Sequence, residues 1–481
     1  MSERIQPQSS QNWLPSYGRL AIANIVSNLM VPLAGIVDTA FLGHLADIRH
    51  LAGVALATVI FNFIYWGFGF LRMGTTGLTA QAVGRQDRTE VWLIGLRGGL
   101  LALGFGLVLL GLQIPLRELG FALLQADADV LASGREFYNA RIWGAPAVLL
   151  NYVLLGWFLG QSQGRQVITL SVIGNGANVV LDSWFIRQLG WASYGAGLAT
   201  ALSQYLMLAV GVGMVLGKGA RVKGERRLRQ PCPLGYRGKG EGRTRGYHGL
   251  TFGLLKGGRD REDRVVFEKL LDWAAIQKLF QLNRDILVRT LALLLSFALF
   301  TNLSSGMGRD ILAVNTLLLQ VVTLVAYFLD GIAFATETYA GRFYGQRNVG
   351  QLRRLLRLGG GVSVMLSVGI AIAFLVFPKP FFLLLTDHDE VLALVNTYVG
   401  WLLPVLSFGA VAFMLDGYFL GLTAGGALRN STVISTFLGF GPVAMMAYWL
   451  QSPHLLWLAM TCFMAARAVT LGWLVRETLV E

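Results

Sequence analysis

The feature that most constrains this chain is a series of long apolar segments that recurs along almost its whole length. A helix needs about 20 apolar residues to cross a bilayer. Only 14% of the 481 residues are charged, against about 25% in soluble proteins. Because helices satisfy their own backbone hydrogen bonds in lipid, we predict an all-α polytopic membrane protein with twelve transmembrane helices in two six-helix bundles. The predicted spans are 17–43, 51–83, 92–112, 132–160, 165–187, 194–216, 281–305, 312–341, 355–377, 392–421, 431–450 and 454–475.

A basic, glycine-rich stretch separates the two groups of six spans. Residues 217–272 carry 15 Lys and Arg against 7 Asp and Glu, which supplies +8 of the net charge of +13. Basic loops favour the cytoplasmic side, so we interpret the stretch as a cytoplasmic linker rather than a nucleic-acid site. A patch for anionic lipids is the alternative. The predicted parts are an N-terminal lobe at 1–216, a linker at 217–274 and a C-terminal lobe at 275–481, with both termini cytoplasmic in a cell (inner) membrane.

The two halves carry an internal repeat. Shifted by 261 residues, the segment 51–87 lies on 312–348, and GWFLGQSQG at 156–164 lies on GYFLGLTAG at 417–425. Two separate matches at one offset indicate a duplicated six-helix unit. Since six is even, the halves are expected to be related by a pseudo-two-fold axis along the membrane normal, as in many secondary transporters.

Two aspartates lie deep in the spans of the first half. Asp38 follows Pro32 by six residues on the first span, where a proline lets a helix bend. On the fifth span Asn178 and Asp182 are four residues apart, hence on one face. With the predicted topology, Thr200 of the sixth span lies at a similar depth, so four oxygen-bearing side chains are expected to converge.

Carboxylates inside a membrane are costly and mark functional sites. Two of them in one apolar pocket favour holding a proton, and the same oxygens could coordinate Na⁺ instead. We therefore predict a cation-coupling site at Asp38 and Asp182, which are also the candidate metal ligands. Asn178 and Thr200 either belong to this site or only form hydrogen bonds with the backbone or with neighbouring side chains.

Three further acids lie in spans of the second half. Asp330 and Glu337 are seven residues apart on the eighth span, and Asp416 precedes the repeated GYFLG segment of the tenth. They are secondary acidic candidates for a transport role. The alternatives are solvation for Glu337 and ion pairs to buried arginines for the other two. The arginines available for such pairs are Arg72, Arg141, Arg289 and Arg467.

Other motifs favour packing over chemistry. Glycines with GxxxG spacing allow close helix approach; they are Gly156, Gly160, Gly164, Gly417, Gly421 and Gly425. A set of aromatics packs the core or faces lipid, or lines a cavity for flat cations; it comprises Phe61, Tyr65, Trp66, Trp143 and Trp157. The G-x-S-x-G match at 160–164 ends a membrane helix, whereas the hydrolase motif requires a strand-to-helix turn. ATP-binding and HExxH motifs are absent.

The chain resembles the multidrug and toxic compound extrusion (MATE) family, and within it the DinF-type branch. The resemblance covers about 17–216 and 275–475. The segments that carry it are VDTAFLGHL at 37–45, GLTAQAVGR at 77–85, NRDILVRT at 283–290, LDGIAFATE at 329–337 and GALRN at 426–430.

This resemblance implies two lobes around a central cleft and antiport of organic, often cationic, compounds against H⁺ or Na⁺. It further implies a cation site formed by Asp38, Asn178, Asp182 and Thr200, with bending of the first helix at Pro32. Asp416 matches a C-terminal-lobe acid used in other branches. The long basic loop has no counterpart in the pattern.

We predict a secondary active antiporter that works by alternating access, is not an enzyme, uses no cofactor beyond its coupling ion and acts as a monomer on small molecules within the lipid bilayer. A flippase for lipid-linked intermediates is the nearest alternative, although only twelve spans are predicted. A membrane-embedded enzyme and a passive channel are weaker ones, since catalytic clusters and rings of like charge are missing.

Overall fold

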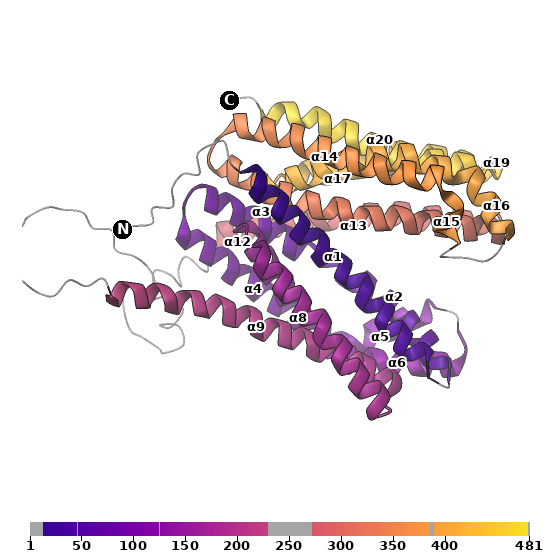
Figure 1. The fold of residues 1–481 in the computed structure, drawn as a ribbon, viewed down its shortest axis with the longest axis horizontal. Helices are drawn as coiled ribbons and strands as arrows, with labels where there is room; N and C mark the ends of the chain where they lie inside the picture. The colour runs from indigo at the N-terminus through magenta and orange to yellow at the C-terminus, as the bar shows by residue number, and fades with distance from the viewer. Residues whose placement is uncertain (1–12, 46, 125, 229–271, 384–388, 480–481) are drawn as a thin grey trace, which may run out of the picture.

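The computed structural model describes residues 13–45, 47–124, 126–228, 272–383 and 389–479. Every regular element within these ranges is helical, and the helices form two lobes (Figure 1). We call residues 13–228 the N-lobe and residues 272–479 the C-lobe. The predicted all-α, two-bundle fold is confirmed.

The N-lobe contains six membrane-spanning segments, three of which are built from two helical pieces. Its elements are α1 (Leu14–Gly43), α2 (Arg49–Gly67), α3 (Phe70–Gly84), α4 (Arg88–Gly111), the short α5 (Gln113–Ala122), α6 (Ala128–Arg141), the 3₁₀ turn η1 (Ile142–Gly144), α7 (Ala145–Gly160), α8 (Gly164–Asp182), the π-helical η2 (Ser183–Gln188) and α9 (Ala192–Leu228).

The C-lobe repeats this order of elements. It comprises α12 (Trp273–Gly306), α13 (Arg309–Gly345), α14 (Val349–Val376), the short α15 (Pro378–Phe382), α16 (Asp389–Tyr398), the 3₁₀ turn η3 (Val399–Trp401), α17 (Leu402–Gly421), α18 (Gly425–Ile434), the π-helical η4 (Ser435–Phe440), α19 (Gly441–Leu450) and α20 (Pro453–Thr478).

Eleven segments of the described chain are long and apolar enough to cross a membrane. The twelfth predicted span is α8 with η2, which runs between α7 and α9 as a helix of similar length. It is less apolar because it carries Asn175, Asn178 and Asp182. The basic loop predicted at 217–272 is helical as far as Leu228, where it continues α9. Its remainder, 229–271, lies outside the described residues.

The turns of the two lobes repeat at the offset of 261 residues. Gln86 and Arg347 both have positive φ, at 61° and 54°. The next residue caps the following helix in both lobes: Asp87 accepts from the Glu90 N–H at 3.0 Å, and Asn348 accepts from the Gln351 N–H at 3.1 Å. The predicted duplication therefore extends to backbone conformation.

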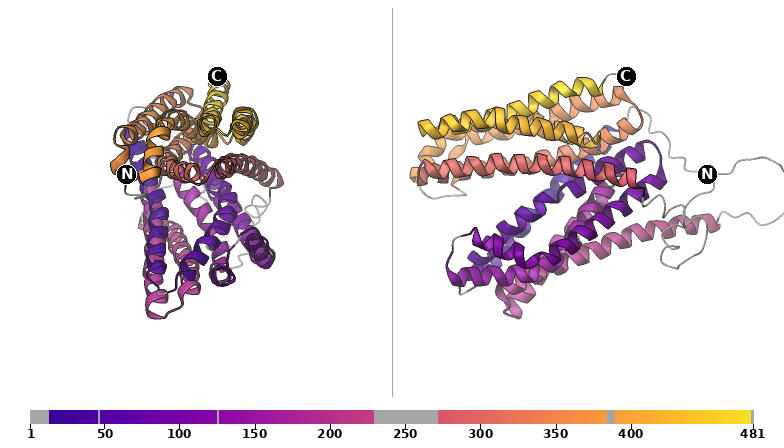
Figure 2. Two further views of the ribbon diagram at one scale, coloured as in Figure 1. Left: turned by 90° about the vertical axis from the view of Figure 1, so that its right-hand side faces the viewer. Right: turned by 180° about the vertical axis from the view of Figure 1, so that it is seen from behind.

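The lobes contact each other at the end where α1 begins and α20 finishes, and they diverge toward the opposite end (Figure 2). At the closed end, α13 of the C-lobe packs against α1 and α3 of the N-lobe. The indole N–H of Trp13 donates to Gln351 Oε1 at 2.7 Å, and the hydroxyls of Tyr17 and Thr336 are 2.9 Å apart.

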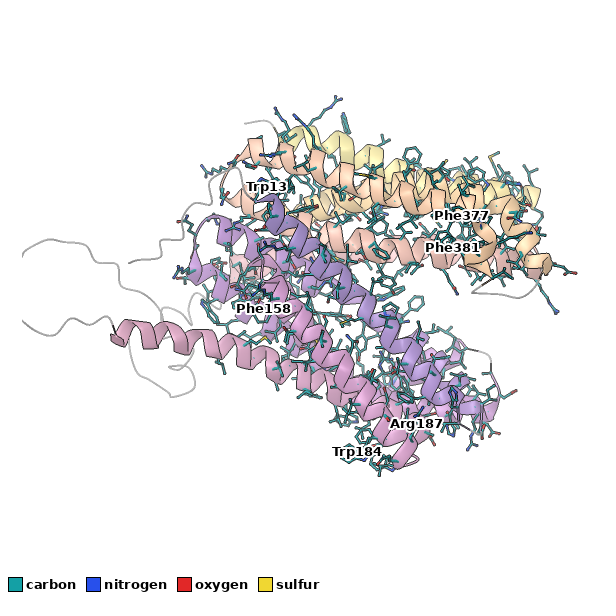
Figure 3. The ribbon with its side chains drawn as sticks, viewed as in Figure 1. Trp13, Phe158, Trp184, Arg187, Phe377 and Phe381 are labelled. Atoms are coloured by element: carbon teal, nitrogen blue, oxygen red, sulfur yellow. The ribbon has the colours of Figure 1, made fainter. Side chains whose placement is uncertain are left out.

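Side chains labelled in Figure 3 mark the end where the lobes meet and the far ends of the two lobes. Trp13 lies where the lobes meet, whereas Trp184 and Arg187 lie at the far end of the N-lobe, and Phe377 and Phe381 at the far end of the C-lobe (Figure 3). The closed end therefore holds the two bundles together, and the splayed end leaves their inner faces separated.

Candidate functional site

Helices α1 and α8 pack side by side in a fixed register. The hydroxyls of Ser27 and Ser171 are hydrogen-bonded between them. Eleven residues further along each helix stand Asp38 and Asp182. Because eleven residues are close to three full turns, two helices running in the same direction bring these aspartates to the same side as the serine pair.

The carboxyl groups of Asp38 and Asp182 lie within hydrogen-bonding reach of each other. Asp182 is fully buried, with 0% of its surface exposed, and Asp38 is half-buried. The amide of Asn178 donates to Asp182 Oδ2 at 2.8 Å. One oxygen of each carboxyl group, Oδ1, has no hydrogen-bond partner. A carboxyl group donates only when it is protonated, so this contact is favourable when a proton lies between the two groups.

No hydrogen bond joins the other two predicted residues to this pair in the described chain. Thr200 lies on α9, which packs against α8, but its hydroxyl donates to Ala196 O of its own helix at 2.9 Å. Pro32 lies inside α1, which continues as a helix on both sides of it. Directly after Asp182 the helix widens into the π-helical η2, a feature frequent at functional sites.

A half-buried arginine lies near the carboxyl pair, and it is one of the arginines that the sequence offers for structural ion pairs. Arg141, the last residue of α6, interacts electrostatically with Asp38 and Asp182. Its guanidinium carbon lies 4.6 Å from the centroid of the Phe61 ring and 5.4 Å from that of Phe137. The available signal in the sequence was a charge in the middle of the fourth span, where charge is costly.

The aromatics predicted to pack or to line a cavity divide into two groups. Phe61, Tyr65 and Trp157 are buried in the N-lobe core, while Trp66 and Trp143 are exposed. The Trp157 indole N–H donates to Val91 O at 2.7 Å. The cation that Phe61 and Tyr65 face is the guanidinium of Arg141, so these two rings stabilise a positive charge of the protein itself.

The C-lobe aspartate has a different environment. Asp416 on α17 accepts hydrogen bonds through Oδ2 from Arg289 of α12 and from Arg467 of α20. All three residues are buried, and Arg467 has 0% exposure. The ion pair to buried arginines that was the predicted alternative for Asp416 is present, and two guanidinium groups compensate its charge.

The remaining two acids lie on α13 near Arg72 of the N-lobe, which interacts electrostatically with both. Asp330 is half-buried. Glu337 is 1% exposed, and the backbone N–H of Gly77 in α3 lies near its carboxyl group. The interpretation of Glu337 as a solvated residue is wrong, because its side chain is buried where α13 of the C-lobe packs against α3 of the N-lobe.

The repeated glycines serve packing, as predicted. A methyl group added at Gly156 would collide with the backbone oxygen of Arg72, and one at Gly417 would collide with that of Ala333. The G-x-S-x-G match forms the turn between α7 and α8, where Ser162 has φ of 60°. Within the described residues it adjoins no strand, so the structural context of a hydrolase is missing.

The oxygens around Asp38 and Asp182 are few. Within the described ranges, no group of three or more His, Cys, Asp or Glu side chains converges as a metal site. Two carboxyl groups and the Asn178 amide supply fewer oxygens than the six or more that Ca²⁺ requires.

Comparison with known proteins gives matches across both lobes. The MatE family model matches residues 23–184 and 286–449. The chain is 35% identical over 456 residues to DNA damage-inducible protein F of Escherichia coli, covering 94% of this chain and 90% of that protein. It is 22% identical over 420 residues to the probable multidrug resistance protein NorM of Thermotoga maritima, covering 86% and 79%.

A solved structure described as the outward-facing conformation of a multidrug resistance MATE family transporter of the MOP superfamily has the same fold. Its TM-score is 0.78 at 19% identity, and the match covers 97% of this chain and 96% of that one. Neither part of the family match includes the region between residues 184 and 286.

Proposed function

The chain belongs to the MatE family of membrane transporters, and on that premise we propose that it exports organic compounds in exchange for a cation bound between Asp38 and Asp182. It is a multi-pass membrane protein and a transporter of small molecules, not an enzyme. The coupling ion we propose is a proton, with Na⁺ as the alternative that the experiment below separates.

The observation that carries this proposal is the contact between the two carboxyl groups inside the N-lobe. Neither of them forms an ion pair with a basic residue of the described chain. Their charge is therefore free to be neutralised by an exchangeable ion. Unpaired charge in a membrane is costly, so loading and unloading this pair changes the free energy of the lobe.

We further propose that the arrangement of the lobes is the outward-facing state. The basic loop and the positive-inside rule support a cytoplasmic location for the end where the lobes touch. In this state the splayed end faces outward and Asp38 is partly accessible. The same rule supports a cytoplasmic location of both termini, and we propose that the protein acts as a monomer in the inner membrane.

Coupling requires that the ion interact differently with the two states, because equal affinity would shift neither. Loading the Asp38–Asp182 pair from outside is proposed to bend α1 at Pro32 and expel the organic compound. The loaded protein then reopens toward the cytoplasm, where the ion leaves and a new substrate molecule enters.

The test is exchange of a fluorescent organic cation in inside-out membrane vesicles, driven either by an acidic interior or by interior Na⁺. We expect dye accumulation with the proton gradient and its collapse on adding a protonophore. Asp38→Asn and Asp182→Asn should reduce accumulation to the level of vesicles that lack the protein, while the purified variants keep the unfolding temperature of the unmodified chain.

The matched control is Asp129→Asn, which changes an exposed aspartate at the start of α6 and should transport normally. Full dye transport by Asp38→Asn would refute the coupling role. If dye accumulation is driven only by Na⁺ and is lost in Asp38→Asn and Asp182→Asn, the proposed site stands and the coupling ion is Na⁺ rather than H⁺.

A further inference from the structure

Arg141 is held in the N-lobe by aromatic rings rather than by an acid. Its guanidinium carbon lies 4.6 Å from the Phe61 ring centroid, 5.4 Å from that of Phe137 and 6.0 Å from that of Tyr65. Nε has no hydrogen-bond partner. A guanidinium over aromatic faces is stabilised by the ring quadrupoles, so the rings fix this charge inside the lobe.

The charge nevertheless acts on the coupling site. Arg141 interacts electrostatically with both Asp38 and Asp182, yet no ion pair joins it to either of them in the described chain. The titratable groups around it come from five other helices: Asp38 of α1, Tyr65 of α2, Tyr152 of α7, Asp182 of α8 and, beside Tyr65, Tyr205 of α9.

The C-lobe shows what direct contact would do. There Arg289 and Arg467 both bond to Oδ2 of Asp416, and their two positive charges exceed its single negative charge, so the cluster would repel a cation entering from water. At Asp38 and Asp182 no ion pair joins the guanidinium of Arg141 to a carboxyl oxygen in the described chain, and Oδ1 of each carboxyl group has no hydrogen-bond partner. A cation that binds these oxygens therefore displaces no guanidinium, while the positive charge of Arg141 still acts on both carboxyl groups.

We propose that Arg141 is the fixed counter-charge of the coupling site, which limits the Asp38–Asp182 pair to one monovalent cation per cycle and eases the release of that cation. The two ionised carboxylates with Arg141 carry a net charge of −1, which one H⁺ or Na⁺ neutralises. Without Arg141 the charge would be −2, and a second cation would be needed. This inference rests on the proposed function of the aspartate pair.

The experiment compares Arg141→Gln with Arg141→Lys in proteoliposomes, with the initial rate of dye exchange measured as a function of pH. Removal of the positive charge strengthens proton binding by the carboxylates, so we expect the Arg141→Gln profile to move toward alkaline pH by about one unit. Arg141→Lys retains the charge and should keep the original profile. A lumenal pH dye should show more protons per dye molecule in Arg141→Gln than in the unmodified chain.

The matched control is Arg135→Gln on the same helix, where Arg135 is exposed and pairs with Glu118 at 2.9 Å; its profile should not move. If Arg141→Gln does not fold, Arg141→Met removes the charge with an apolar chain suited to the surrounding rings. For a Na⁺-driven protein, the apparent Na⁺ affinity replaces the pH profile as the measurement. It should rise in Arg141→Gln and stay unchanged in Arg141→Lys and Arg135→Gln.

A rate that falls equally at every pH, with an unchanged ion-to-dye ratio and no rescue by Lys, would mean that Arg141 only packs, and it would overturn this inference. That result leaves the proposed function intact if Asp38→Asn and Asp182→Asn still abolish exchange. Retained exchange in both aspartate variants would refute the proposed function itself.

Discussion

The two lobes bury the same pair of residue types, aspartate and arginine, and arrange them in opposite ways. In the N-lobe Asp182 lies beside another aspartate, and the guanidinium of Arg141 packs against aromatic rings. In the C-lobe Asp416 bonds to two arginines. The difference shows that the charge of Asp416 is already compensated inside the protein, whereas no ion pair in the described chain compensates Asp38 or Asp182.

The backbone of the lobes differs far less than their charges. The left-handed turn residues Ser162 and Thr423 occur at the repeat offset, with φ of 60° and 56°. One contrast concerns the first helix of each lobe: α1 contains Pro32, whereas α12 has no internal proline. Of the two first helices, only α1 therefore contains a proline at which it can bend.

The largest effect on stability is expected when the C-lobe ion pair is broken. Asp416→Asn leaves Arg289 and Arg467 uncompensated in the core, which should cost about 3–5 kcal/mol and lower the unfolding temperature in detergent. Asp38→Asn is the N-lobe comparison and should unfold at the temperature of the unmodified chain. An Asp416→Asn protein that is fully stable yet inactive would make Asp416 a second coupling residue and break the contrast.

A smaller loss is expected at the packing glycines, and here the lobes should behave alike. Gly156→Ala and Gly417→Ala each force a methyl group onto the backbone of a neighbouring helix, so each should destabilise its lobe by about 1–3 kcal/mol. The control is Gly104→Ala, since a methyl group at Gly104 would meet nothing within 4 Å. Thermal unfolding of the three variants measures the effect, and wild-type stability of either packing variant would contradict it.

Pro32→Ala should change the rate of transport rather than the stability of the protein. A proline inside a helix removes one backbone hydrogen bond, so its replacement should leave α1 as stable or more stable. If bending of α1 is part of the cycle, dye exchange should slow several-fold while the pH profile keeps its midpoint. Unchanged exchange would show that α1 acts without bending at this position.

The smallest change is expected at Thr200. Its hydroxyl bonds within its own helix, and such a bond contributes about 0.5–1.5 kcal/mol. Thr200→Val should therefore alter the exchange rate by less than about threefold, as measured in the same vesicles. A loss as large as that of Asp182→Asn would place Thr200 among the ion ligands.

Much of the fold follows from the sequence alone. The bilayer fixes the length of each apolar run, and a helix satisfies its backbone hydrogen bonds within the run itself. The order of the spans, the duplication at 261 residues and the presence of Asp38, Asp182 and Asp416 within spans were therefore predictable. The four-residue spacing of Asn178 and Asp182 also gave their shared face, because that relation lies within one helix.

What the sequence could not determine is which charges meet. The partners of Asp416 are 127 and 51 residues away along the chain, and the contact of Asp38 with Asp182 depends on the register of α1 against α8. Hydropathy sets how long each helix is and leaves its rotation and sliding free; side-chain packing between helices fixes both. Only the tertiary structure therefore decided that Asp416 bonds to two arginines, whereas Asp38 and Asp182 lie beside each other.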